Sequence, residues 1–93
     1  MELRHIRYFK AVAEEKNFTR AAEKLAIAQP PLSRQIQDLE AELGTQLFIR
    51  SPHKVTLTEE GELFLQYASQ ILDLVHRSEE EKKVCREPYI LLP

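Results

Sequence analysis

The sequence has one cysteine, two glycines and no apolar stretch of the roughly eighteen residues that a membrane-spanning helix requires. A single cysteine, Cys85, excludes an internal disulfide and suits a reducing compartment. The first five residues, Met-Glu-Leu-Arg-His, contain no apolar core of the kind found in secretory signals. These absences argue against a membrane partner and against export, and we expect a cytoplasmic protein.

Residues that usually carry catalytic or metal chemistry are also scarce. Gly44 and Gly61 are too few and too far apart for a glycine-rich phosphate-binding loop. His5, His53 and His76 lie in three separate segments, without a cysteine or carboxylate at metal-ligand spacing, so we expect each at the surface. The cysteine lies in an acidic segment without a histidine partner, which is a poor setting for a nucleophilic thiolate. The sequence therefore predicts no enzyme, no metal site and no cofactor.

Residues 18–44 carry the clearest pattern in the chain, two helical segments joined by a short connection. The second segment begins at a proline pair, and its apolar residues recur at helical spacing on a single face: Leu32, Ile36, Leu39 and Leu43. Arg34, Gln37 and Ala41 lie on the opposite face, and Ser33 lies on the flank near the start. One face of this helix is therefore suited to burial, and the other to hydrogen bonding with a partner.

The preceding helix, over about residues 19–26, is short and turns Ala21, Ala22 and Leu25 inward. The two alanines allow a crossing helix to pack closely. We expect Thr19 to cap the N-terminus of this helix. Two short helices joined by a tight turn describe a helix-turn-helix. Because many small helical domains share this geometry, it does not decide the function by itself.

A helix is also expected over residues 2–16, before this unit. Its apolar residues recur every three or four positions: Leu3, Ile6, Phe9 and Ala13. Tyr8 and Val12 lie toward another side, so we expect this helix to pack on more than one neighbour. We interpret it as a scaffold helix.

Residues 46–57 contain two β-prone runs around a proline-containing turn, which predicts a β-hairpin. We expect Leu47 and Leu57 to pack at its base. The basic side chains expected to project near its tip are Arg50, His53 and Lys54. A hairpin after a helix-turn-helix is a wing, and its basic tip is either a solvated turn or a contact to phosphates or the minor groove.

From Glu59 the apolar period becomes helical again, after a candidate N-cap at Thr58. The apolar stripe of this helix comprises Phe64, Tyr67, Ala68, Ile71, Leu74 and Val75. Continued to Arg86, the helix would have about 28 residues and a length of about 42 Å, more than a domain this small covers. The stripe favours pairing with a second copy of the chain. The alternative is that its first half packs on the first helix and the rest frays.

Four motifs occur together in this order: AAEKL from Ala21, QPPLSRQI from Gln29, LEAELGTQLF from Leu39 and LTEEG from Leu57. In this order and spacing they resemble the N-terminal DNA-binding domain of LysR-type transcriptional regulators, over about residues 1–74. The resemblance implies a mainly α fold with a small β-hairpin, a winged helix-turn-helix followed by a long linker helix. We expect the winged helix-turn-helix in residues 1–57, the linker helix in residues 58–87, and a tail of undecided structure in residues 88–93.

By resemblance and position, the function implied is sequence-specific binding of double-stranded DNA in transcription regulation. The expected form is a homodimer on an inverted-repeat operator, with the second helix of the helix-turn-helix in the major groove. Ser33 and Arg34 are the expected base readers, because an arginine can contact a guanine edge with two donors. The proline pair is suited to touching a thymine methyl group. The full set of expected DNA contacts is Arg4, Thr19, Arg20, Gln29, Pro30, Pro31, Ser33, Arg34, Gln37, Arg50, His53 and Lys54.

The sequence departs from the family pattern at two positions. Ala28 stands where most members have a serine that caps the recognition helix, and His53 stands where an arginine is frequent. The resemblance also implies that full-length members carry a C-terminal inducer-binding domain that forms tetramers. We therefore expect this segment to bind DNA without responding to a small-molecule inducer.

The charge of the chain is unevenly distributed. The net charge of −2 argues against a nucleic-acid partner, but residues 1–57 carry nine Lys/Arg against seven Asp/Glu, and residues 58–93 carry four against eight. Local charge governs docking, and the head is mildly basic. We expect weak non-specific DNA binding and reliance on a dimer. The same low basicity supports the alternative, a winged-helix module that binds another protein.

Overall fold

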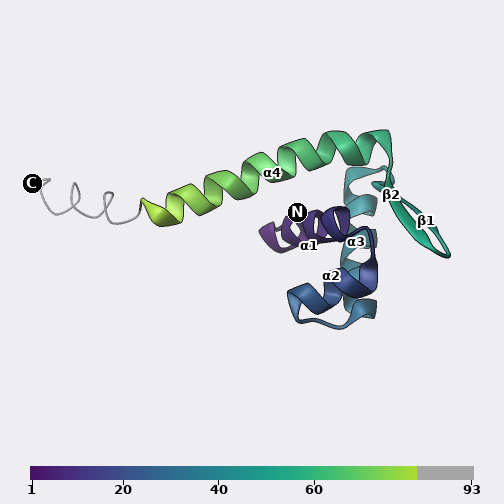
Figure 1. Ribbon diagram of the computed structural model, residues 1–93. Coiled ribbons are helices and arrows are strands. Elements are labelled where there is room, and N and C mark those ends of the chain that lie inside the picture. The colour runs from purple at the N-terminus through teal and green to yellow at the C-terminus, as the bar shows by residue number, and fades with distance from the viewer. Residues whose placement is uncertain (82–93) are drawn as a thin grey trace, which may run out of the picture.

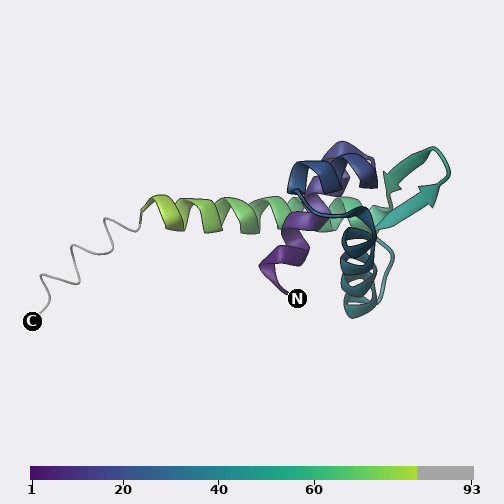
Figure 2. The same cartoon turned by 90° about the horizontal axis from the view of Figure 1, so that it is seen from below.

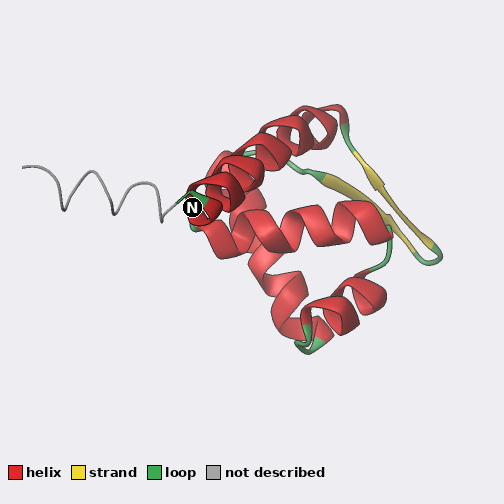
Figure 3. Cartoon of the chain, turned by 60° about the vertical axis from the view of Figure 1, so that its left-hand side comes forward, coloured by secondary structure: helices red, strands yellow, loops and turns green. Residues whose placement is uncertain are grey.

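The computed structural model describes residues 1–81. Its elements are α1 (Leu3–Glu15), α2 (Phe18–Leu25), α3 (Gln29–Leu43), β1 (Phe48–Ser51), β2 (Lys54–Leu57) and α4 (Glu59–Glu80). The helices and the single hairpin are distinguished by colour in Figure 3. The predicted fold class, mainly α with a small hairpin, is confirmed. Expectations for Cys85, the linker beyond residue 81 and the tail 88–93 lie outside the described residues.

Helix α1 is the scaffold that the other helices share. It packs against α2, α3 and the first half of α4, as the two perpendicular views show (Figures 1 and 2). The fully buried large side chains are Phe9, Val12, Leu32, Ile36, Leu39 and Leu47. The predicted inward face of α3 is thus confirmed over its first three positions. Leu43, at the last turn of α3, and Leu3, at the first turn of α1, are exposed because both lie at the edge of the helical body.

The two helices of the helix-turn-helix begin differently, because α2 has a side-chain cap and α3 has none. Asn17 caps α2, and its side-chain oxygen accepts a hydrogen bond from the Arg20 N–H at 2.9 Å. The prediction of Thr19 as the cap was wrong, because α2 already starts at the buried Phe18. Ala28 precedes α3 and makes no side-chain cap, as expected for alanine.

Four aromatic rings form the centre of the core and join the elements that surround it. The centroid of Phe9 in α1 lies 5.2 Å from Phe48 in β1 and 4.9 Å from Phe64 in α4. Phe18 at the start of α2 lies 6.0 Å from Phe48. Aromatic pairs at these separations attract one another beyond simple area burial. Phe9 therefore holds the wing and the long helix against α1.

The predicted apolar stripe of α4 is divided between two faces. Ala68 is fully buried and Phe64 and Ile71 pack against the core, so these residues face α1 rather than a partner. Tyr67 and Leu74 are exposed, at 55% and 60%. The expectation that the whole stripe serves dimerisation was wrong, because α1 covers its inner half. Beyond this contact α4 extends away from the helical body (Figure 1). No helix within residues 1–81 has the length and apolarity to cross a bilayer.

The wing is tied to α4 at its base. β1 and β2 pair antiparallel, with Phe48 opposite Leu57 at the base and Ser51 opposite Lys54 at the tip. The Thr58 hydroxyl accepts from the Gly61 N–H at 2.9 Å and donates to the Gln46 carbonyl at 2.7 Å. The predicted N-cap at Thr58 is confirmed, and it links the first turn of α4 to the connection that precedes β1.

Replacing Gly61 by alanine is expected to lower the free energy of unfolding by about 1–3 kcal/mol, the usual cost of overpacking. A methyl group at this position would overlap the carbonyl oxygen of Leu47 and crowd Leu57, and a backbone carbonyl cannot rotate away. The helix-propensity gain of alanine, about 1 kcal/mol, opposes but does not cancel this clash. Urea unfolding followed by circular dichroism measures the difference. Gln70→Ala, at an exposed position of the same helix, is the control, and equal stability of both variants would contradict the prediction.

Candidate nucleic-acid interface

Helix α3 exposes the face that lacks large apolar side chains. Arg34 and Gln37 are exposed on this face, and Ser33 is half-buried at its flank. Leu32 and Ile36, on the other side of the helix, are fully buried. The core contact therefore fixes the rotation of α3 and leaves its donor side chains free to meet a partner. An α-helix with such a face fits the major groove of DNA.

The first turn of α3 adds a compact surface beside these side chains. Gln29 is half-buried, and Pro30 and Pro31 are exposed. Both proline rings and Arg34 border one shallow hollow. Because prolines have no N–H, they leave fewer unsatisfied donors in a helical turn that lacks a capping side chain. The structure thus places the proline pair, which is expected to touch a thymine methyl group, beside Arg34, which is expected to contact a guanine.

A second hollow, of about 400 Å³, joins the start of α2 to the wing. Thr19 borders it from α2, and His53 and Lys54 border it from the wing tip. Arg20 is exposed in the same first turn of α2. Lys16, in the connection between α1 and α2, also borders the hollow and adds a second ammonium group near Lys54. Sequence analysis missed Lys16, because nothing in its sequence neighbourhood shows that the connection faces the wing.

Arg50 does not project from the wing tip. Its guanidinium Nη1 donates to the Ser33 hydroxyl oxygen at 3.0 Å, and Nη2 lies 3.7 Å from a carboxylate oxygen of Glu40. The guanidinium also lies 4.5 Å from the centre of the Phe18 ring. The expectation of a free tip residue was wrong, because Arg50 is in β1, two residues before the turn at Pro52, and its side chain turns back to α3.

Glu40 is a partly buried carboxylate that sequence analysis did not single out. One of its oxygens accepts from the backbone N–H of Leu47 at 2.7 Å and of Phe48 at 3.2 Å. Its other oxygen faces Arg50. The available signal was an acidic residue directly after a buried leucine in the LEAELG motif. The pattern gave no indication that its partners are seven and eight residues ahead.

Arg4 lies apart from the other predicted contacts. Its guanidinium pairs with Glu2 at 2.7 Å, and the Met1 ammonium pairs with Glu42 near the C-terminal end of α3 at 2.6 Å. Glu42 is eight residues from Arg34, or about 12 Å along a helix. The start of α1 therefore lies at the opposite end of α3 from the donor face, and the structure does not bring Arg4 to that face.

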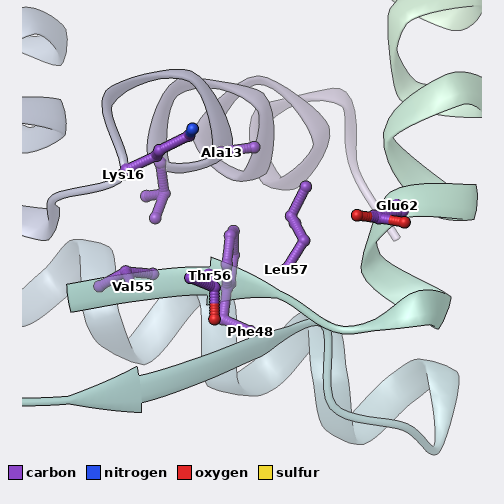
Figure 4. A pocket seen from close by; sticks show the side chains of 8 residues that line it. Ala13, Lys16, Phe48, Val55, Thr56, Leu57 and Glu62 are labelled. Carbon is purple, nitrogen blue, oxygen red and sulfur yellow. The ribbon is translucent and has the colours of Figure 1, made fainter.

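The hollow in Figure 4 lies between the end of α1, the wing and the start of α4, and measures about 260 Å³. Its lining is largely apolar, with Lys16 and Glu62 at opposite sides. The polar groups do not converge on a common point as those of a catalytic site do. Among residues 1–81, no three side chains are placed to hold a metal ion.

A family model described as bacterial regulatory helix-turn-helix protein, lysR family, matches residues 3–62. The chain belongs to the lysR family. The resemblance read from the four motifs is thereby confirmed, and the matched range covers the helix-turn-helix, the wing and the first turn of α4.

The relatives of this lysR-family chain include regulators and solved DNA complexes. The HTH-type transcriptional regulator BenM of Acinetobacter baylyi is 63% identical over 75 residues, which are 81% of this chain and 25% of BenM. A crystal structure of BenM_DBD with catB site 1 DNA has a TM-score of 0.87 at 58% identity and covers 89% of this chain and 92% of that one. A CbnR_DBD–DNA complex has a TM-score of 0.88 at 44% identity, covering 92% and 99%. The chain spans about a quarter of the length of such full-length relatives.

Proposed function

We propose that this lysR-family chain is a sequence-specific DNA-binding domain of a transcription regulator and that it catalyses no reaction. The observation that carries the proposal is the exposed donor face of α3, with Arg34 and Gln37 turned away from a core that fixes the helix. The similarity of the fold to BenM_DBD and CbnR_DBD, both solved with DNA, supports it. Bacterial DNA lies in the cytoplasm, so the proposal implies that location.

In the proposed complex α3 lies in the major groove. Arg34 places two donors on a guanine edge, and Ser33 donates to a neighbouring acceptor. Pro30 and Pro31 meet a thymine methyl group, which their apolar rings suit. The side chains around this centre bond phosphates or bases and set the register of the helix. They are Thr19, Arg20, Gln29 and Gln37.

The wing contacts the backbone next to the groove. Lys54 and His53 are exposed at its tip, where a phosphate or the minor groove would pass. Arg50 contacts the DNA backbone from the junction between the wing and α3, not from the wing tip. These groups supply affinity that does not depend on sequence and that weakens as salt increases.

We further propose that two copies act together on an inverted repeat. The division into a reading head of residues 1–57, a linker helix of residues 58–87 and a tail of residues 88–93 belongs to this proposal. Exposed apolar side chains of α4, including Tyr67 and Leu74, support pairing between linker helices. No inducer site is proposed in this segment, so a small molecule should not change its affinity for an operator.

Replacing Arg34 by alanine should weaken binding to the operator by about 1–3 kcal/mol, or about 5- to 150-fold, because one bidentate base contact is lost. The preference for the base pair it reads should relax. Both effects can be measured with duplexes that the parent chain selects from a random pool, called selected duplexes below, and with single-base variants of them.

Lys54→Ala is the matched variant on the wing. It should weaken binding to all sequences alike and reduce the slope of log affinity against log salt by about 1, because Lys54 meets only a phosphate. If Arg34→Ala and Lys54→Ala both bind selected duplexes as the parent does, the proposed DNA contacts of α3 and the wing fail. If the parent selects no duplex, the protein-binding alternative becomes the better explanation of the exposed α3 face.

A further inference from the structure

Glu40 uses its two carboxylate oxygens for different partners. The side chain is 14% exposed and lies at the junction of α3 with the wing. Oε2 accepts from the backbone N–H groups of Leu47 and Phe48, which lead into β1. Oε1 faces the guanidinium of Arg50 in β1 at 3.7 Å. One side chain on α3 therefore holds both the backbone and a side chain of the wing.

Arg50 is held by α2 and α3 before any DNA arrives. The Ser33 hydroxyl oxygen accepts a hydrogen bond from Nη1 of Arg50, and the Glu40 carboxylate attracts Nη2. The guanidinium also lies over the Phe18 ring. These three partners come from the start of α2, the start of α3 and the end of α3. A long side chain that is already ordered loses less freedom on binding than a mobile one. Its remaining donors stay available for a phosphate.

The same contact affects Ser33. Because the Ser33 oxygen accepts from Arg50, its own hydroxyl proton remains free to donate. Ser33 then meets a hydrogen-bond acceptor on DNA more readily than a donor. Guanine and adenine N7, thymine O4 and phosphate oxygens are acceptors of this kind.

We propose that Glu40 is a positioning residue for DNA reading, which acts by holding Arg50 against Ser33 so that the wing and α3 meet the duplex as one surface. The inference rests on the proposed DNA-binding function. Charge alone predicts that removing the Glu40 carboxylate strengthens DNA binding, because a carboxylate close to an anionic duplex repels it. Glu40 lines a hollow of about 400 Å³ between α3 and β1 together with Gln37 and Arg50, so its charge lies close to the proposed DNA-binding surface.

Glu40→Gln separates the two roles of the carboxylate. The amide oxygen of glutamine still accepts from the N–H groups of Leu47 and Phe48, whereas the NH₂ group facing Arg50 no longer attracts it. Circular dichroism and the thermal midpoint should stay close to those of the parent. Affinity for selected duplexes at fixed salt should fall about five- to tenfold, the size of a coupling within one hydrogen-bond network.

Glu42→Gln is the matched control, since it removes the same charge two residues farther along α3, where the carboxylate pairs with the Met1 ammonium instead of Arg50. It should bind as tightly as the parent or more tightly. Arg50→Lys keeps the positive charge but not the planar fork, and it should lose affinity as Glu40→Gln does. In an Arg50→Ala background, Glu40→Gln should cause no further loss, because its effect passes through Arg50.

The sign of the change decides the result. Weaker binding by Glu40→Gln with unchanged folding, alongside a neutral Glu42→Gln, supports the positioning role. Equal or tighter binding by Glu40→Gln, while the parent discriminates between sequences, overturns this inference and leaves the proposed function intact. A parent chain that selects no duplex from the random pool overturns both. Heteronuclear relaxation of the Arg50 Nε–H gives an independent readout, since the arginine should become more mobile in Glu40→Gln without DNA.

Discussion

Replacing Phe9 by alanine should lower the free energy of unfolding by about 3–5 kcal/mol, the usual cost of removing a buried phenylalanine. Phe9 is fully buried in α1 and contacts the rings of Phe48 in the wing and Phe64 in α4. Its loss would leave a cavity where three elements meet, together with two rings that have lost their partner. Among the aromatic rings of residues 1–81, Phe9 is the one that contacts both a ring of the wing and a ring of the long helix.

The effect is large relative to the whole stability of a domain this size, which is typically about 5–15 kcal/mol. Urea unfolding followed by circular dichroism measures it, and the midpoint should fall sharply. Ile49→Ala is the control, because Ile49 is a large apolar residue of the wing that is 56% exposed, and its removal should cost about 0.5 kcal/mol or less. A Phe9→Ala variant within 1 kcal/mol of the parent would contradict the role assigned to the aromatic junction.

The helix-turn-helix was predictable because its pattern is local. Leu32, Ile36 and Leu39 follow the helical period, and the structure buries all three. Their spacing determines which side of α3 is exposed, so it also predicted that Arg34 and Gln37 lie on the exposed side. Family motifs then supplied the order of helices and wing, which the periods alone do not give.

The period of α4 predicted a helix but not what covers it. Phe64 and Ala68 belong to the core, whereas Tyr67 and Leu74 are exposed, although all four were assigned to one stripe. A broad apolar arc can be shared between a neighbouring helix and a partner chain, and the spacing does not say where one contact ends. The boundary between the two parts of the stripe depends on the position of α1, which the sequence of α4 does not contain.

The junction between α3 and the wing could not be predicted for a different reason. Arg50 and Ser33 are seventeen residues apart, and Glu40 bonds to backbone N–H groups that have no side-chain signature. A sequence pattern reports faces of single elements. It does not report which donors meet across two of them. The candidate base readers were therefore accessible from sequence, but the residues that position them were not.

Replacing Leu74 by glutamate should separate a dimer into monomers. Leu63, Tyr67 and Leu74 are exposed on one arc of α4, and Leu74 lies beyond the part of the helix that α1 covers. A symmetric pairing of linker helices would bring two introduced carboxylates into an apolar contact, where unpaired charge is costly. Because Leu74 is not part of the core, folding of the head should be unaffected. Sedimentation equilibrium measures the change in mass.

The loss of pairing should appear strongly in DNA binding. Two linked heads on two half-sites gain about 10²–10⁴ in affinity over one head, so Leu74→Glu should lose a factor of that order on an inverted repeat. Its affinity for a duplex with one half-site should equal that of the parent. His76→Glu adds the same charge on the other side of α4 and should remain dimeric. A Leu74→Glu chain that stays dimeric, or that loses affinity equally on both duplexes, would show that the exposed arc of α4 is not where the copies meet.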